Sequence, residues 1–187
     1  MKKIILASLL LLLTSGYAMA EKYTIDPAHT YPNFTISHLG FSTMHGQFAK
    51  TKGTLEFDKA SGTGSVDIII DTGSIYTGFA KRDKHLRSPD FFNAVEFPEM
   101  TFKSTAANLK GGSGTVDGKL TIMGITKDVT LKVSKIHCGK HPFNPKVAEV
   151  CGFDATANIK RTDFGLKYGM PAIGDDVAIS LEVEATR

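Results

Sequence analysis

The sequence has little net charge and almost no long apolar run, and each shortage excludes a class of protein. The formal net charge is +3 over 187 residues, and it falls to +1 when the first 20 residues are set aside. Nucleic-acid-binding proteins usually carry a clear basic excess, so the composition excludes nucleic acid as an expected partner. The one long apolar run, residues 4–13, is too short to cross a bilayer, and we expect no stable membrane insertion.

The apolar run belongs instead to an expected export signal at residues 1–20. Two lysines precede the run, and Ala18-Met19-Ala20 supplies the small residues of a cleavage site. We therefore expect a mature protein that begins at Glu21, forms one domain over residues 21–187 and is located in the periplasm.

Motifs that carry enzyme chemistry are also missing. The chain has no H-E-x-x-H sequence, no G-x-S-x-G elbow and no glycine-rich loop before a helix. We accordingly expect no metal, no cofactor and no catalytic residues.

Cysteine is scarce, and the two present, Cys138 and Cys151, allow two interpretations. In an exported protein a single pair favours a disulfide, which would close a proline-containing loop and stabilise the fold by about 3 kcal/mol. The alternative is a metal site that adds His137 and His141. That set lacks the paired spacing typical of structural zinc sites, so we predict the disulfide.

Period-two alternation dominates the rest of the chain and predicts β-strands. It is clearest near the C-terminus, where the odd positions from Val177 to Ala185 are apolar and the even positions are mostly polar. Short strands separated by turn signals such as Met123-Gly124 indicate an antiparallel sandwich or barrel. The same alternation occurs at residues 34–36, 55–57, 66–70, 100–102, 120–122 and 129–133.

Residues 76–93 break the alternation and predict helix. Phe79, Asp83 and Leu86 recur at helical spacing, and Ser88 followed by Pro89 is typical of a helix start. We therefore expect one or two helical turns, then a second short helix beginning at Ser88, lying across one end of the sheet.

This helical segment concentrates basic and aromatic residues, and two readings stay open. The basic side chains either form a solvated helix face with weak internal ion pairs, or line a rim that recognises a phosphate or polar headgroup. Aromatic neighbours favour the rim. The residues concerned are Lys81, Arg82, Lys84, His85 and Arg87, beside Phe79, Phe91 and Phe92.

Taken together, the motifs resemble those of the YceI-like family of periplasmic, lipocalin-like lipid-binding proteins. The most specific block runs from Arg82-Asp83-x-His85-Leu86-Arg87-Ser88 to Asp90-Phe91-Phe92. The chain also resembles the family at residues 23–26, 46–48, 118–127 and 176–179, and departs from its more familiar members in the Cys138–Cys151 loop.

The resemblance implies an all-β fold, an eight-stranded antiparallel lipocalin-like barrel with a short helical segment around residues 78–93. It implies a carrier for an isoprenoid lipid, such as a polyprenyl quinone or its precursor, in an elongated apolar cavity. An eight-stranded barrel has an interior large enough for one ligand. The expected ligand-binding residues are Phe34, Ile36, His38, Phe48, Ile68, Arg82, His85, Arg87, Phe91, Phe92, Met100, Phe102, Ile122 and Ile179.

A second function remains open at this point. The protein could be a hydrolase or isomerase acting on such a lipid, with His85 as acid or base, although no nucleophile–base pair is evident in the sequence. The oligomeric state is also open, with a homodimer as one alternative.

Overall fold

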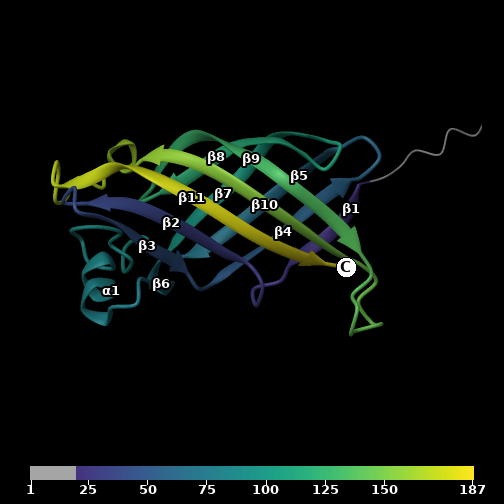
Figure 1. Cartoon of the computed structure of the whole chain (residues 1–187), viewed down its shortest axis with the longest axis horizontal. Coiled ribbons are helices and arrows are strands. Elements are labelled where there is room, and N and C mark those ends of the chain that lie inside the picture. The colour runs from purple at the N-terminus through teal and green to yellow at the C-terminus, as the bar shows by residue number, and fades with distance from the viewer. Residues whose placement is uncertain (1–19) are drawn as a thin grey trace, which may run out of the picture.

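The computed structural model describes residues 20–187, so the expected export signal lies outside it except for Ala20. Strands make up most of the described chain, and one α-helix and two short 3₁₀ helices (η) interrupt them (Figure 1). In chain order the elements are β1 (Glu21–Ile25), β2 (Tyr31–His38), β3 (Ser42–Phe48), β4 (Thr51–Asp58), β5 (Thr63–Asp71), η1 (Thr72–Ser74), β6 (Ile75–Tyr76), α1 (Ala80–Leu86), β7 (Glu99–Lys110), β8 (Ser113–Ile122), β9 (Ile125–Gly139), β10 (Val150–Lys160), η2 (Arg161–Phe164) and β11 (Ile173–Thr186).

The strands form a closed antiparallel barrel of eight, which confirms the expected fold. The ring runs β1-β4-β5-β7-β8-β9-β10-β11 and closes where Thr24 and Ile25 of β1 pair with Thr186 and Ala185 of β11. Strand β2 follows β1 along the same edge of β11, and β3 precedes β4. β1 together with β2 therefore acts as one long bent strand of the wall, and β3 together with β4 acts as another.

The helical segment differs from the prediction after its first half. Helix α1 is present, but no second helix begins at Ser88. The Ser88 hydroxyl accepts a hydrogen bond from the Asp90 N–H at 3.3 Å, as a helix cap would. The backbone carbonyl of Ser88, however, accepts the N–H groups of both Phe91 and Asn93, which is a turn pattern. Asn93 has a φ of 45°, and this left-handed conformation turns the chain out of a helical path.

Within residues 20–187 no helix is long and apolar enough to span a membrane.

Two glycines let aromatic rings lie flat against the inner wall. A Cβ at Gly46 would meet the Phe34 ring at 2.3 Å, and one at Gly118 would meet the Phe102 ring at 2.4 Å. Both rings therefore occupy space that any larger residue would fill. The sequence places Phe34 and Phe102 on inward positions, and the glycines allow their rings to spread over the neighbouring strand.

The barrel has two different ends. Helix α1, the β2–β3 turn and η2 lie at one end, and the C-terminus and the loop between β9 and β10 lie at the other (Figure 1). Cys138 and Cys151 at the base of that loop form a disulfide, which confirms the predicted pairing and leaves no thiol for the metal alternative.

Candidate binding cavity

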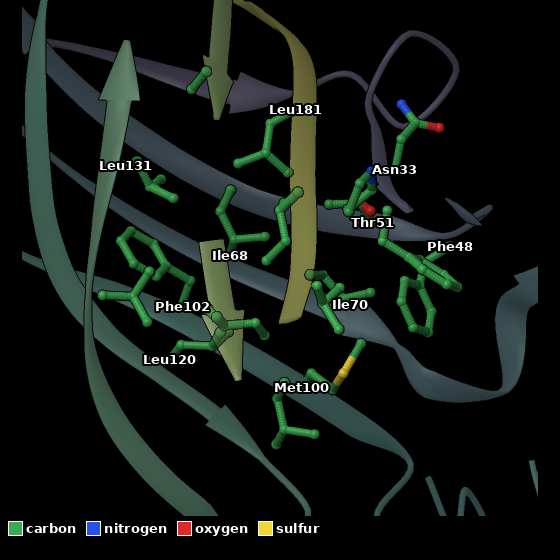
Figure 2. Close-up of a pocket in the computed structure, with 18 of the residues that line it drawn as sticks. Asn33, Phe48, Thr51, Ile68, Ile70, Met100, Phe102, Leu120, Leu131 and Leu181 are labelled. Atoms are coloured by element: carbon green, nitrogen blue, oxygen red, sulfur yellow. The ribbon is translucent and has the colours of Figure 1, made fainter. Parts of the chain in front are cut away.

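The barrel encloses a cavity of about 460 Å³. Ligand pockets for small molecules span roughly 300–1,000 Å³, so one apolar molecule can be held here. The inward residues of successive strands form the wall, and Figure 2 shows Ile68, Ile70, Phe102, Leu120 and Leu181 projecting into one space. Alternation along each strand explains the apolar lining, since every second side chain faces inward.

Strand β7 keeps its inward side apolar despite a change of register. Met100 and Phe102 line the cavity at even positions, whereas Ala107 and Leu109 line it at odd positions. The pairing of β7 with β8 shifts between Ser104 and Ala106, and the extra residue exchanges the two faces. The bulge thus allows both halves of a twelve-residue strand to contribute to the same cavity.

The structure brings together almost all the residues expected to contact a ligand. Arg87 is the exception, because it is not among the lining residues and its guanidinium instead lies 3.5 Å from the carbonyl of Ile75. The residues that line the cavity are Phe34, Ile36, His38, Phe48, Ile68, Arg82, His85, Phe91, Phe92, Met100, Phe102, Ile122 and Ile179.

Aromatic rings connect the helical segment to the wall. Phe48 packs edge-on against Phe92 with ring centroids 5.5 Å apart. His85 of α1 lies 5.1 Å from both Phe91 and Tyr168, and those two rings are themselves 5.1 Å apart. Tyr168 belongs to the loop between η2 and β11, so this ring cluster joins α1 to the neighbouring loop at the same end of the barrel.

Arg82 is held at the cavity by Thr77 rather than by an acid. Its Nε and one Nη donate to the hydroxyl and the carbonyl of Thr77, both at 2.7 Å. Asp83 is buried and accepts the N–H and hydroxyl of the same threonine. Thr77 therefore links Arg82 and Asp83, and the alternative of internal ion pairs on the helix face does not hold for these two residues. Arg82 keeps three N–H groups unused by these bonds.

A second arginine, Arg161, also lines the cavity and is buried, and the sequence pattern did not indicate it. It is 5% exposed and donates to the backbone carbonyls of four residues at 2.7–3.1 Å: Leu166, Tyr168, Ile173 and Gly174. Burial lowers the pKa of Arg161 below its ordinary value, and Asp175 opposes that shift. One N–H stays unused by these four bonds, so Arg161 can still donate to a ligand. In the sequence it is one arginine in a polar stretch, and no periodicity marks it.

Two further groups of polar side chains have the spacing of chemical sites. His85 Nε2 and Asp90 Oδ2 are 2.7 Å apart, as in a base and its orienting carboxylate, but no hydroxyl or thiol of residues 20–187 is hydrogen-bonded to His85. Asp26, His29 and Glu184 bring three ligand atoms within 4.8 Å of one another, a spacing that could hold a metal. His29 and Glu184 have exposed side chains, and His29 already pairs with Asp26 at 2.8 Å.

The opposite end of the barrel is closed around Tyr23. This side chain is 1% exposed, and its hydroxyl donates to Glu149 at 2.6 Å and lies 2.8 Å from Glu21. Burial and these two acids raise the pKa of Tyr23 to about 12. Burial alone would raise the pKa of Glu149, but hydrogen bonds from Lys59, Tyr23 and Arg187 lower it to about 2. The network therefore favours an ionised Glu149 at this end.

Comparisons with known proteins agree with the barrel. The family described as "YceI-like domain" matches residues 23–185. A "UPF0312 protein" of Pseudomonas aeruginosa is 40% identical over 179 residues, which cover 94% of this chain and 92% of the relative.

Solved structures share the architecture. BcnA of Burkholderia cenocepacia superposes with a TM-score of 0.75 at 27% identity, covering 86% of this chain and 98% of BcnA. A domain from Saccharophagus degradans described as polyisoprenoid-binding has a TM-score of 0.65 at 17% identity, over 90% of this chain and 98% of that domain. At 17% identity the second similarity concerns the fold alone.

Proposed function

The chain belongs to the YceI-like family, and from this premise we propose that it is an exported carrier of a long-chain isoprenoid lipid, a polyprenyl quinone or its precursor. In this proposal the domain of residues 21–187 is released into the periplasm and holds the lipid inside the barrel. The observation that carries the proposal is the cavity of about 460 Å³, whose strand-derived wall is almost wholly apolar.

The lining suits a ligand with a long apolar chain. Each methylene of such a chain costs about 0.8 kcal/mol when it is exposed to water. Complete transfer of a five-carbon isoprene unit from water into the dry cavity therefore contributes about 4 kcal/mol of binding free energy. A molecule that moves through an aqueous compartment with its chain shielded avoids that cost, and the barrel supplies the shield.

The helix end of the cavity suits a polar headgroup. Arg82 and Arg161 line the cavity there and retain unused N–H donors, while Asp83 and Asp90 are absent from the lining. Quinone and phenol oxygens accept hydrogen bonds, so a headgroup at this end of the cavity could accept from these donors. The enzyme alternative has only the His85–Asp90 pair in its support, and we favour the carrier.

A series of isoprenoid alcohols of increasing chain length tests this proposal. Affinity should rise steeply with each added isoprene unit and then become constant once the cavity is full. Native mass spectrometry or equilibrium dialysis measures the affinities. Equal affinities for the shortest and longest alcohols would refute the carrier function, since an apolar cavity must favour the longer chain until it is filled.

A further inference from the structure

Exposed apolar side chains gather at the end of the barrel that carries α1. Residues 20–187 have nine exposed large apolar side chains, and seven of them lie in four segments: residues 38–42, 77–98, 122–126 and 161–172. We call these segments the mouth loops. Phe41 is 89% exposed and Val95 is 95% exposed, so neither packs on the barrel. The other members are Leu39, Phe79, Ile125, Tyr168 and Met170.

The mouth loops contact one another and form one surface. The Leu39 N–H donates to the carbonyl of Ala172 at 2.8 Å, which joins the first segment to the fourth. A Cβ built on Gly165 would lie 3.4 Å from Ile125, and one built on Gly124 would lie 3.3 Å from Phe97. The second, third and fourth segments are therefore neighbours too. Figure 1 shows the β2–β3 turn and the start of β11 together at this end.

Unpaired lysines accompany the apolar side chains. Lys81, Lys84 and Lys167 are exposed and have no ion-pair partner within residues 20–187. The mouth loops also contain four acids: Asp83 is buried, Asp90 lies 2.7 Å from His85, Glu96 accepts from Asn93 at 2.7 Å, and Asp163 is exposed. With six lysines and arginines against four acids, the mouth loops carry a net charge of +2. The surface thus combines exposed apolar groups with a positive excess, as peripheral proteins do where they contact anionic bilayers.

The cavity reaches this surface. His85 and Tyr168 line the cavity and are also partly exposed, with Tyr168 at 49%. A lipid chain entering or leaving at this end would cross water unless the mouth touched the bilayer from which the lipid comes. Contact with the bilayer would spare the chain this exposure to water.

We propose that the mouth loops dock on a phospholipid bilayer that contains anionic lipid, with Phe41 and Val95 inserted among the headgroups and Lys81, Lys84 and Lys167 against the phosphates. This docking places the cavity mouth on the membrane for loading and release of the ligand. It rests on the proposed carrier function for its purpose, but the docking itself is measured without any ligand.

Vesicle flotation offers a direct test with a matched control in the same chain. The probe is a vesicle of phosphatidylethanolamine and phosphatidylglycerol, compared with one of phosphatidylcholine alone. Phe41→Ser should weaken binding to the anionic vesicle about tenfold or more, since a phenylalanine side chain is lost from the bilayer. Phe143→Ser should leave binding unchanged, because Phe143 is equally exposed, at 91%, but lies in the loop at the opposite end.

Two more variants separate the two components of the proposed surface. Val95→Ser should act like Phe41→Ser, and Lys84→Gln should weaken binding about fivefold at low salt, since one lysine near an anionic surface contributes about 1 kcal/mol. Both side chains are exposed, so the thermal midpoint of each variant should match that of the parent protein.

Several results would overturn the docking proposal. They are an absence of vesicle binding by the parent protein, equal losses for Phe41→Ser and Phe143→Ser, or a dimer that Phe41→Ser abolishes while no protein floats with vesicles. Isoprenoid content is measured on the same preparations by solvent extraction. A parent protein that floats but carries no isoprenoid would contradict the carrier function and leave the docking supported, so the two failures are distinguishable.

Discussion

Filling the cavity from one wall position should abolish lipid binding without unfolding the barrel. Ile68 lies in the middle of β5, pairs with Gly53 and Phe102, and projects into the cavity (Figure 2). In Ile68→Trp the indole occupies roughly the space of one isoprene unit. At about 0.8 kcal/mol for each of five carbons, the displaced unit is worth about 4 kcal/mol, so affinity should fall roughly a hundredfold to a thousandfold.

The neighbouring residue provides the control. Ile69 follows on the same strand, pairs with Lys52 and Thr101, and is not among the lining residues. Ile69→Trp therefore makes the same change on the outer face and should leave affinity within about twofold. Overpacking inside the barrel costs about 1–3 kcal/mol, so a lower thermal midpoint for Ile68→Trp alone is no contradiction.

Tryptophan fluorescence checks where each indole lies, because the sequence contains no tryptophan. Emission from Ile68→Trp should be that of an apolar surrounding and that from Ile69→Trp should be shifted toward water. Equal lipid affinities for the two variants, with the barrel folded and the Ile68→Trp emission apolar, would refute the assignment of this cavity as the lipid site.

Three further outcomes are expected. Arg82→Ala should weaken the binding of a quinone about tenfold more than that of a headless chain of equal length, because a charged hydrogen bond is lost. Arg87→Ala should affect both ligands equally, since Arg87 does not line the cavity. Titration of each variant with both ligands measures this, and equal losses for Arg82→Ala would make Arg82 a scaffold residue. Glu149→Gln should lower the free energy of unfolding by about 2 kcal/mol at neutral pH. A carboxyl whose folded pKa is about 2 against an ordinary 4.5 stabilises the fold above pH 4.5 and loses this contribution as the pH falls toward 2, so urea unfolding should show the two proteins converging in acid; a constant gap would contradict it. Reducing the Cys138–Cys151 disulfide should cost about 3 kcal/mol in the same assay, and two free thiols in unreduced protein would disprove the bond.

The alternation of apolar and polar residues along each strand predicts the cavity wall well, because every second side chain of a strand points into the same cavity. The alternation at residues 66–70 predicts one strand face with Val66, Ile68 and Ile70, and all three line the cavity. The pattern could not reveal the bulge in β7, since a one-residue shift looks like an interruption in the alternation. It also could not predict that β1 pairs with β11, because that closure joins residues about 160 positions apart and depends on the whole ring.

The helical segment shows where local signals mislead. Ser88 and Pro89 have the residue types of a helix start, and the Ser88 hydroxyl does accept a backbone N–H. Packing of Phe91 and Phe92 against His85 and Phe48 holds the following residues in turns instead. Arg161 could not be predicted for a related reason. Its position depends on four backbone carbonyls that fold around it, and the neighbouring sequence contains no signal for these contacts.

The most direct test of the carrier function is native mass spectrometry of the protein purified from the exported fraction of its own cells. We expect one bound molecule per chain, released by organic solvent, whose fragments differ by whole isoprene units. The Ile68→Trp variant purified in the same way should lack it. Parent protein that carries no lipid, or a lipid without isoprene units, would contradict the account.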